Sequence, residues 1–600
     1  MEQYLNTLIH KESIVTLMLT IFNRMKKLSL IAAALLVNTL FAQPYPKDYF
    51  QSPMDITIKL AGNFGELRPN HFHAGIDITT SGVENLAVKA AADGYVSRIK
   101  ISPWGYGHAI YITHPNGYTT VYGHLNSYNA TINDWVEKQQ YAAESFEIDW
   151  YPKPTDLPVK KGEQIGYSGN TGSSGGPHLH FEIRDSKTEE ALNPLLFGMP
   201  VQDNVAPVPV TLAVYAAGED SYVNGKNGAK KISLVKKGNK YVLQNAADSI
   251  LAFGDIGFGV EAYDKETIEH GKNGVYGIKL IAGGKTIYSH HLDRIPFEDS
   301  RYINCFVDYE EHERTGKYFQ LSYLTPNNEL PIYDSVMNNG YVTHNDGKYH
   351  WYTYEITDVY GNKSILEFKV KALIKNPEAK AGGQIVMPYT QMLIWNGENK
   401  IEEQEFKLET PSKSVYKNVN FKWTSTKATG SRLSSTIGIN DHFTALHKSC
   451  TLTVNMPANT AMTDKLVMCR EKEKGGFSAV GGKWNGSGVT AEIKECGKYF
   501  VMRDTTAPTV KPMNFDAGGK TDTAFTAMKS IQFKIGDNLS GVETYRGTID
   551  GKWVLFEYEP KKDRLQYTFD EHCGKGKHEL VMIITDAVGN QTKFTRKFTR

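Results

Sequence analysis

The sequence predicts an all-β protein built from several domains. Its 600 residues exceed what one hydrophobic core normally organises, and its composition is that of an ordinary globular protein. From residue 56 to about residue 198 the chain consists of short β-type runs separated by glycine-rich turns. Beyond Pro200 it changes to longer polar strands with alternating aromatic residues. We therefore expect an N-terminal β-sheet or barrel-like domain, followed by several β-sandwich modules.

The N-terminal domain, residues 43–200, contains six predicted strands. They cover residues 86–91, 94–101, 109–113, 118–124, 164–168 and 178–183. Two of these runs flank the segment His114-Pro115-Asn116-Gly117, in which the Asn-Gly pair favours a tight hairpin turn. The pattern indicates a compact all-β unit.

A weak internal repeat divides the rest of the chain. One unit opens at residues 204–208 and closes at 356–363, and the other opens at 505–509 and closes at 584–591. Each closing segment is a strand, a Gly-Asn turn and a final strand, which is an ordinary end for a β-sandwich. We therefore expect sandwich modules at 201–376 and 504–600, which resemble bacterial immunoglobulin-like domains. Residues 377–503 are predicted to form a further β-rich module of unclear type.

The first 42 residues indicate export. Lys26-Lys27 precede an apolar run, residues 28–41, that ends at Ala42, which is typical of a secretory signal peptide. The run is too short to span a bilayer comfortably, and no cysteine follows it to carry a lipid anchor. We therefore expect an exported protein that is not transmembrane after cleavage and is periplasmic, envelope-associated or secreted. Met25 could start this signal by itself, so residues 1–24 are either a true extension or a misassigned start.

Charge and cysteine content exclude some functions. The 67 lysines and arginines nearly balance the 66 aspartates and glutamates, so no overall field favours nucleic acid as a partner. The five cysteines, Cys305, Cys450, Cys469, Cys496 and Cys573, form no CxxC zinc motif. A disulfide among Cys450, Cys469 and Cys496 and free buried cysteines are equally good interpretations.

Three short segments concentrate histidine and aspartate: residues 70–77, 122–125 and 176–181. Because side chains alternate across a strand, His178 and His180 are expected on one face, with Leu179 and Phe181 on the core side. One of the two histidines can bind a metal while the other reaches a substrate beside it.

His73 and Asp77 require a turn between them if they share an ion. On a straight strand they would lie about 13 Å apart, which is too far for ligand bonds of about 2 Å. Ala74-Gly75 provide small residues there, and glycine tolerates the dihedral angles that a turn can require. Two imidazoles and one carboxylate suit Zn²⁺, and three protein ligands leave the fourth position open, as in catalytic sites.

This pattern, H-x-x-x-D followed by a later H-x-H, resembles the lysostaphin/LytM-type family of zinc metallopeptidases over residues 56–198. Supporting motifs lie at residues 86–96, 122–125 and 159–182. The resemblance implies that His73, Asp77 and His180 hold one Zn²⁺ per chain, and that His124 and His178 line the reaction centre. It implies an exported endopeptidase that hydrolyses peptide cross-links of bacterial peptidoglycan. Which of the two histidines acts as base stays open.

Two other functions stay open. Some members of this family have lost zinc ligands and activate separate wall amidases, although the ligand set is intact here. Alternatively, the C-terminal modules make the chain a surface adhesion or wall-docking protein with envelope partners, because sandwich folds do not specify function. For an endopeptidase, the bond is either D-alanyl-diaminopimelate or a polyglycine bridge, and the long tail without a wall-anchoring sequence favours the former.

The remaining histidines are interpreted more conservatively. His108, His114, His290 and His291 are expected to be structural or surface residues. His71 shares strand parity with His73, so it is a candidate for a contact behind the ligands or to the substrate. The glycine-rich loop 166–176 lacks the Gly-Lys-Ser/Thr ending of a phosphate loop, so we expect a turn that leads into the histidine strand.

Residues 126–158 form an insertion, since related sequences connect the same two strands by a much shorter link. Asn133 or Asp134 is the predicted helix cap, and apolar residues from Trp135 to Phe146 would share one side of the helix. Three prolines at positions 152, 154 and 158 would end helical structure. Because the insertion begins just after His124, we expect it beside the active site as a lid or groove wall. An inert surface decoration is the alternative, because loops tolerate long insertions at little cost.

Overall fold

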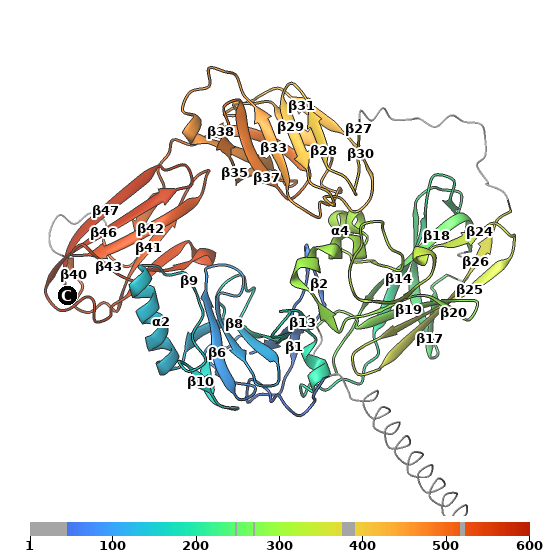
Figure 1. The fold of residues 1–600 in the computed structure, drawn as a ribbon, viewed down its shortest axis with the longest axis horizontal. Coiled ribbons are helices and arrows are strands. Elements are labelled where there is room, and N and C mark those ends of the chain that lie inside the picture. Colours follow the sequence, from blue (N-terminus) through green and yellow to red (C-terminus); the bar gives the residue numbers. More distant parts are fainter. Residues whose placement is uncertain (1–44, 246–248, 268–270, 375–390, 517–522) are drawn as a thin grey trace, which may run out of the picture. The chain divides into compact units, whose positions relative to one another are not determined.

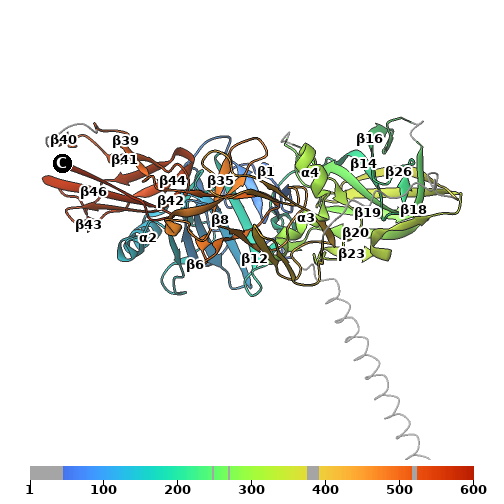
Figure 2. The same ribbon diagram turned by 90° about the horizontal axis from the view of Figure 1, so that it is seen from above.

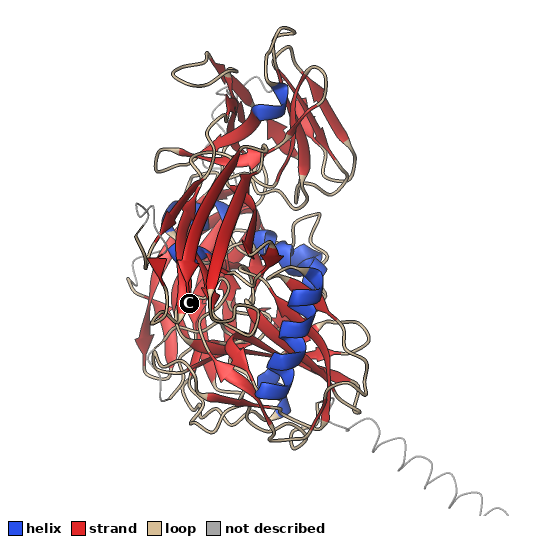
Figure 3. Ribbon diagram, turned by 90° about the vertical axis from the view of Figure 1, so that its left-hand side faces the viewer, coloured by secondary structure: helices blue, strands red, loops and turns tan. Residues whose placement is uncertain are grey.

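The computed structural model describes residues 45–600, apart from 246–248, 268–270, 375–390 and 517–522. The predicted signal peptide and the boundary between residues 376 and 377 lie outside the described residues. Strands dominate the described chain, and its longest helix is α2 (Ala130–Ala143) (Figure 3). None of the described helices is long and apolar enough to cross a membrane. The all-β prediction is confirmed.

The N-terminal domain is an antiparallel sheet (Figure 1; Figure 2). Its main path runs through β1 (Leu60–Gly62), β4 (Ile76–Thr79), β12 (His178–Asp185), β8 (Tyr118–Tyr128), β7 (His108–Thr113), β6 (Gly94–Ile101) and β10 (Pro158–Val159). The shorter elements around it are β2 (Leu67–Arg68), β3 (His71–Phe72), β5 (Ala87–Lys89), β9 (Ile148–Trp150), β11 (Gln164–Ser168), β13 (Ala191–Leu192) and η1 (Pro194–Phe197). The strands predicted at 94–101 and 164–168 coincide with β6 and β11.

Local chemistry explains the central strands of this sheet. Leu179 and Phe181 are fully buried in β12, so the alternation predicted for the histidine strand is confirmed. The predicted hairpin between β7 and β8 is also present. The amide of His114 donates to the Tyr118 carbonyl oxygen, and Gly117 has a φ of 87°, which favours glycine.

The helix of the insertion begins earlier than predicted. Strand β8 continues to Tyr128 because it pairs with β11, and α2 follows directly with Asn129 as its cap. The Asn129 side chain accepts a hydrogen bond from the Ile132 amide at 2.9 Å. The caps predicted at Asn133 and Asp134 are therefore wrong, and Phe146 lies beyond the helix end. The return strand β9 pairs with β6.

The N-terminal sheet extends past residue 200. Strand β21 (Arg294–Ile295) pairs with β13, with Ala191 opposite Ile295. One hydrophobic cluster joins Phe64 and Phe72 to Ile295, Phe306 and other buried residues of the following module. The peptidase-like domain is therefore stabilised by a segment from the next module.

The first sandwich follows the N-terminal domain and closes its sheet through a pairing of β18 with β26. Its path contains β15 (Tyr222–Val223), β18 (Ile250–Tyr263), β14 (Val208–Ala216), β16 (Ala229–Lys237), β17 (Lys240–Leu243), β26 (Lys363–Ala372), β25 (Tyr349–Thr357), β19 (Gly277–Ala282), β20 (Lys285–His291) and β23 (Tyr333–Val336). β22 (Gln320–Leu321) and β24 (Val342–His344) also pair with β18. Its described helices are η2 (Phe297–Tyr302), α3 (Ile303–Phe306), α4 (Tyr309–Thr315) and η3 (Asn338–Gly340).

The middle module encloses its core between two five-stranded sheets. One contains β28 (Asn399–Glu402), β29 (Phe406–Thr410), β33 (Cys450–Asn455), β37 (Gly488–Ile493) and β36 (Lys483–Trp484). The other contains β31 (Trp423–Thr426), β32 (Thr436–Ile439), β38 (Gly497–Arg503), β34 (Leu466–Glu471) and β35 (Phe477–Gly481). A separate pair, β27 (Gln391–Leu393) with β30 (Val419–Phe421), and η4 (Thr463–Lys465) complete it.

The last sandwich also has two sheets around one core. One contains β39 (Thr509–Pro512), β41 (Ser530–Gly536), β45 (Arg564–Thr568) and β44 (Glu557–Glu559). The other contains β40 (Thr523–Ala524), β47 (Gln591–Thr599), β46 (Lys577–Asp586), β42 (Val542–Ile549) and β43 (Lys552–Trp553). The short helix η5 (Pro560–Lys562) connects β44 to β45. All five cysteines of the chain are buried and unpaired, as the free-cysteine interpretation predicts.

Candidate metal centre

Strand register brings the predicted ligands together. Strand β12 lies between β4 and β8, and it places His180 opposite Asp77 on one side and opposite Gly123 on the other. His73 enters from the segment between β3 and β4. His73, Asp77 and His180 are 2%, 6% and 3% exposed, so the centre is almost fully buried.

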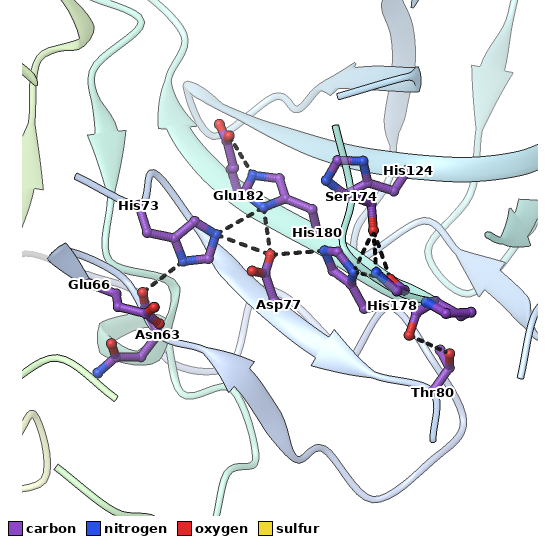
Figure 4. Close-up of polar contacts among 12 residues, drawn as sticks. Asn63, Glu66, His73, Asp77, Thr80, His124, Ser174, His178, His180 and Glu182 are labelled. Atoms are coloured by element: carbon purple, nitrogen blue, oxygen red, sulfur yellow. Dashed lines mark hydrogen bonds and ion pairs between the residues drawn. The ribbon is translucent and has the colours of Figure 1, made fainter. Parts of the chain in front are cut away.

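Three ligand atoms converge (Figure 4). The Nε2 atom of His73 lies 3.1 Å from Asp77 Oδ1 and 3.1 Å from His180 Nδ1. The third side of the triangle, from His180 Nδ1 to Asp77 Oδ1, is 2.8 Å. These three residues form one of the groups of the described chain that could hold a metal ion.

The other polar atom of each ligand is also occupied. His73 Nδ1 lies 2.8 Å from the carbonyl oxygen of Asn63, which leaves Nε2 directed at the centre. Arg68 donates to Asp77 Oδ2 at 2.6 Å, so the carboxylate has one oxygen left for a metal. Such outer contacts fix the tautomer and orientation of metal ligands.

His180 is fixed through a chain of side chains on its own strand. Its Nε2 lies 2.8 Å from Glu182 Oε1, and Arg184 donates to Glu182 Oε2 at 2.6 Å. Glu182 is fully buried. The Tyr106 ring stacks on the His180 imidazole at 4.9 Å between centroids. His180 Nδ1 is thereby left for the metal.

Gly75 is needed for a reason that the sequence did not reveal. Its φ is not in the left-handed region, so the turn does not use the wider dihedral freedom of glycine. A Cβ atom at this position would lie 2.4 Å from the Phe181 carbonyl oxygen. The turn between His73 and Asp77 therefore requires glycine because β12 passes so close to it.

His124 is placed by a bulge in β8. The pairing of β7 with β8 shifts between His108–Leu125 and Ile110–Tyr122, and His124 has a φ of 58°. Bulges commonly redirect side chains next to active sites. The His124 Nδ1 atom lies 2.8 Å from the Thr171 carbonyl oxygen, and its ring centroid is 4.7 Å from that of His178.

His178 is the more accessible of the two non-ligand histidines, with its side chain 13% exposed. Its Nδ1 lies 2.8 Å from the Gly176 carbonyl oxygen and 3.2 Å from Ser174 Oγ. Its Nε2 lies 3.4 Å from Asp77 Oδ1. The structure thus brings all five predicted site residues together, and both non-ligand histidines border the ligand triangle.

Burial and neighbouring charges shift the proton affinities of the centre. Burial lowers the pKa of His73 to about 4 and that of His124 to about 3. Burial also lowers the pKa of His180, but hydrogen bonds with Asp77 and Glu182 outweigh it and raise this pKa to about 9. Burial raises the pKa of Asp77, yet the nearby histidines hold it well below its usual range.

The donor set fits zinc. Two imidazole nitrogens and one carboxylate oxygen are typical of a catalytic Zn²⁺ site, and contacts on the far side of each ligand are typical of such sites too. His73, Asp77 and His180 would hold the ion. Since metal binding needs neutral imidazoles, an incoming cation has to displace the proton that His180 favours.

Among the described residues, no further histidine joins this group of possible metal ligands. His71 is exposed, and its Nδ1 lies 2.9 Å from the Pro69 carbonyl oxygen, so it is not one of the contacts behind the ligands. His108, His114 and His290 are buried in other contacts, and His291 forms ion pairs with Asp293 and Asp334. The conservative interpretation of these four is confirmed.

Sequence reasoning missed several residues of the centre. Asn63 contributes only its backbone carbonyl, and Arg68 reaches Asp77 from the separate β2–β3 pair, so neither has a local sequence signal. Glu182 had one. It shares the strand face of His180, two residues away, and strand alternation alone makes it a neighbour.

Comparison with known proteins agrees with this geometry. The family model described as peptidase family M23 matches residues 71–150 and 153–194, which include all five site residues. This domain belongs to peptidase family M23. A second model, described as a Zu5-like domain, matches residues 390–504, the module that the sequence left unclear.

The relatives match less than a quarter of this chain, and this chain covers less than a quarter of their own length. "DD-carboxypeptidase/endopeptidase Mpg" of Neisseria meningitidis is 31% identical over 131 residues, 22% of this chain and 24% of that protein. An "uncharacterized metalloprotease" of Haemophilus influenzae is 35% identical over 136 residues, 23% of this chain and 22% of that protein. "Cell division protein DipM" of Caulobacter vibrioides is 27% identical over 129 residues, 22% of this chain and 17% of that protein.

Solved structures match about a quarter of the chain. The catalytic domain of lysostaphin from Staphylococcus simulans is 25% identical and covers 23% of this chain and 91% of its own, with a TM-score of 0.18. A zinc-containing peptidase from Vibrio cholerae is 23% identical and covers 25% of this chain and 40% of its own, with a TM-score of 0.19.

Proposed function

We propose that this protein is an exported, zinc-dependent endopeptidase that hydrolyses peptide cross-links of bacterial peptidoglycan. The observation that carries the proposal is the ligand triangle of His73, Asp77 and His180, bordered by His124 and His178. A site that had lost catalysis would not need both a complete ligand set and two further histidines. The M23 family match and the names of the relatives support the same reaction class.

The chemistry divides between the ion and the chain. A zinc ion in this site would polarise the scissile carbonyl group and lower the pKa of water. His124 is suited to accept the proton of the attacking water. Its Nδ1 faces a carbonyl oxygen and so carries the hydrogen, which leaves Nε2 as acceptor, and burial keeps the ring neutral at pH 7 by lowering its pKa to about 3.

His178 is suited to contact the substrate at the same centre. Its Nδ1 also faces a carbonyl oxygen, that of Gly176, so its Nε2 is left to face the substrate side near Asp77. In this arrangement, His124 takes the proton of the attacking water and later returns it to the leaving amine nitrogen. His178 stabilises the charge that develops on the carbonyl oxygen in the form that carries a hydrogen on Nε2 as well as on Nδ1, because only an N–H donates to that oxygen.

The proposed substrate bond is a D-alanyl-diaminopimelate cross-link. The predicted signal peptide and the long β-rich tail favour a D-alanyl-diaminopimelate cross-link over a polyglycine bridge. The alternatives are an activator of wall amidases that does not itself hydrolyse peptidoglycan, and an adhesion protein that acts through its C-terminal modules. The intact centre favours hydrolysis over both.

The test is digestion of purified peptidoglycan by the chain from residue 43 onward. The full mature chain is needed because β21 completes the M23 sheet. Mass spectrometry should show cross-linked muropeptides converted to monomers, with about one zinc per chain by elemental analysis. Removal of zinc by a chelator should stop turnover, and added Zn²⁺ should restore it.

His71→Ala is the matched control, because it removes an exposed histidine that lies outside the ligand network. It should keep zinc, and a loss of turnover at full zinc content would identify His71 as a substrate contact. Release of free amino sugars or of lactyl-amide cleavage products would contradict the endopeptidase assignment. Full zinc content without turnover on any wall preparation would favour the activator instead.

A further inference from the structure

Two clusters of three aspartates occupy equivalent places in the first and last sandwiches. The first triad is Asp203, Asp264 and Asp358, and the second triad is Asp504, Asp537 and Asp586. Within each triad, one carboxylate oxygen from every residue lies within 4.8 Å of the others. Neither cluster belongs to the M23 centre.

The two triads are built in the same way in their respective modules. Asp203 and Asp504 lie in the segments that enter each sandwich, before β14 and β39. Asp264 directly follows β18, and Asp537 directly follows β41. The strand registers also correspond. Tyr263, just before Asp264, pairs with Val208, the first residue of β14. Gly536, just before Asp537, pairs with Thr509, the first residue of β39.

The third member of each triad lies in the closing hairpin. Asp358 stands between β25 and β26, and Asp586 ends β46 before the turn into β47. Asp358 Oδ1 accepts hydrogen bonds from the amides of Tyr360 and Asn362 at 2.9 Å each. Asp586 Oδ1 accepts the corresponding bonds from Val588 and Asn590 at 3.1 and 2.7 Å. These bonds orient the carboxylates without neutralising them.

The carboxylates of both triads lack ion pairs with described residues. Within the described chain, no lysine, arginine or histidine forms an ion pair with any of the six aspartates. In the first triad, burial and then the charges of Asp203 and Asp358 raise the pKa of Asp264 to about 8. Burial and the charge of Asp358 raise the pKa of Asp203 to about 6. Three ionised carboxylates at this spacing need a compensating cation or a shared proton.

The first triad also presents buried oxygen atoms without hydrogen-bond partners. Asp264 is only 6% exposed, and its Oδ1 has no partner among the described residues. Asn273, 5% exposed, has an Oδ1 atom in the same condition. Both residues line a cavity of about 20 Å³ together with Asp203 and Glu266. That volume accommodates about one water-sized sphere, and hence one ion.

The second triad also has oxygen atoms without hydrogen-bond partners among the described residues, but on partly buried residues, so its assignment follows from its equivalence to the first triad. Asp504 and Asp586 are 1% and 2% exposed. The Oδ1 of Asp537 and the Oγ of Ser540 are buried atoms without hydrogen-bond partners in the described part of the chain. Each triad therefore has three carboxylates and at least one uncharged oxygen nearby, and an unpaired buried oxygen of this kind is costly unless something binds it.

We propose that each aspartate triad binds one Ca²⁺ ion. All the donors are oxygen atoms, which suit a hard cation and not the zinc of the M23 centre. Asp203 and Asp504 come from the segments that enter the two sandwiches, whereas the other members belong to the sandwiches themselves. Calcium therefore fastens each entering segment to the module that it precedes.

The test is calcium binding by the full mature chain, loaded with zinc and passed over a chelating resin. Equilibrium dialysis against ⁴⁵Ca²⁺ with excess Mg²⁺ should find two ions per chain. Asp264→Asn and Asp537→Asn should each bind one, and the double variant none. Asp220→Asn, a change at an exposed aspartate of the first sandwich, should keep both. Zinc content should be the same in all variants.

Thermal unfolding gives a second measurement that does not depend on the variants. Saturating Ca²⁺ should raise the unfolding midpoint of the wild-type sandwiches by about 4–8 °C, because it binds only the folded state. A wild-type chain that binds no Ca²⁺ at 2 mM would overturn the proposal, as would a double variant that keeps both ions. A midpoint that rises on acidification but not with Ca²⁺ would assign the triads to shared protons.

Discussion

The M23 centre and the first aspartate triad both gather buried ligand atoms, but their surroundings differ. In the M23 centre, His73, Asp77 and His180 each have their second polar atom occupied, by a carbonyl oxygen, an arginine and a glutamate respectively. In the triad, Asp264 keeps a buried oxygen that has no hydrogen-bond partner among the described residues, and so does the neighbouring Asn273. The first arrangement is oriented before an ion arrives, whereas in our proposal the second is stabilised by the ion that it binds.

This difference suggests separate roles for two cations in one chain. Mixed nitrogen and oxygen donors with fixed tautomers favour zinc, which we assign to catalysis. Clustered carboxylates favour calcium, which we assign to stabilising the fold. Losing an ion should therefore abolish activity in one region and lower the unfolding temperature in the other. The predictions below test that contrast.

The largest effect is expected when a zinc ligand is removed. His180→Ala and Asp77→Ala each delete one of three ligands, so zinc should be lost and hydrolysis should fall to background. Elemental analysis and muropeptide turnover check the two parts separately. Calcium stoichiometry should not change in these variants. If either variant kept stoichiometric zinc, the ligand assignment would be wrong.

A smaller but still large effect is expected from His124→Ala. His124 borders the ligand triangle without belonging to it, so zinc should stay near one per chain. Turnover should fall by about 10² to 10⁴-fold, which is typical for loss of a positioned acid or base. His71→Ala serves as the control for removal of a nearby histidine. Full zinc loss in the His124 variant would show that it is a ligand.

Glu182→Gln should have an intermediate effect on zinc affinity. The change keeps the shape of a fully buried side chain but removes the charge that orients His180 and pairs with Arg184. Loss of such an outer contact typically costs about 10 to 100-fold in metal affinity. Competition with a zinc-binding dye measures it. An unchanged affinity would mean that Tyr106 and the strand backbone already fix the His180 ring.

The sequence was sufficient to predict that His73, Asp77 and His180 converge, because they lie in two short motifs that the pairing of β4 with β12 brings together. His178 and His180 alternate with core residues, and this period is local. Arg68 and the Asn63 carbonyl could not be predicted, because a separate strand pair and a loop bring them to the centre. The aspartates of the triads show the same division. Asp358 and Asp586 stand in a visible repeat, but their partners come from distant strands.

Errors in the predicted fold have equally specific causes. Asn129, Asn133 and Asp134 are all chemically suitable helix caps, and the choice among them depends on where β8 ends. That end is set by pairing with β11, about forty residues away in the sequence. Gly75 was predicted from turn dihedrals, whereas the cause is the close approach of β12, which only tertiary structure reveals.

The stability of the first sandwich should depend on pH through its aspartate triad. Burial and the charges of Asp203 and Asp358, with a contribution from Glu266, raise the pKa of Asp264 to about 8. The folded state therefore binds the Asp264 proton more tightly than the unfolded state does. In calcium-free buffer this contribution is present below about pH 4 and is lost as pH rises toward 8. Calorimetry should show the first sandwich unfolding a few degrees lower at pH 8 than at pH 6. Asp264→Asn or added Ca²⁺ should remove that difference, and persistence of the same slope in the variant would assign it to other groups.

The smallest effect is expected from removing the insertion. It should change the cleavage rate of intact peptidoglycan more than that of short cross-linked peptides. Helix α2 begins six residues after His124 along β8, which places its start within about 20 Å of the centre at a strand rise of about 3.3 Å per residue. Its return strand pairs with β6 instead of a strand that carries a ligand. Replacing residues 130–156 by a Gly-Ser link would keep β8 and its bulge, so zinc binding and cleavage of short cross-linked peptides should be preserved. Cleavage of intact wall should change several-fold relative to the short peptide, because only a long substrate reaches both the centre and the helix. Equal rates for the two proteins on both substrates would identify the insertion as a surface decoration.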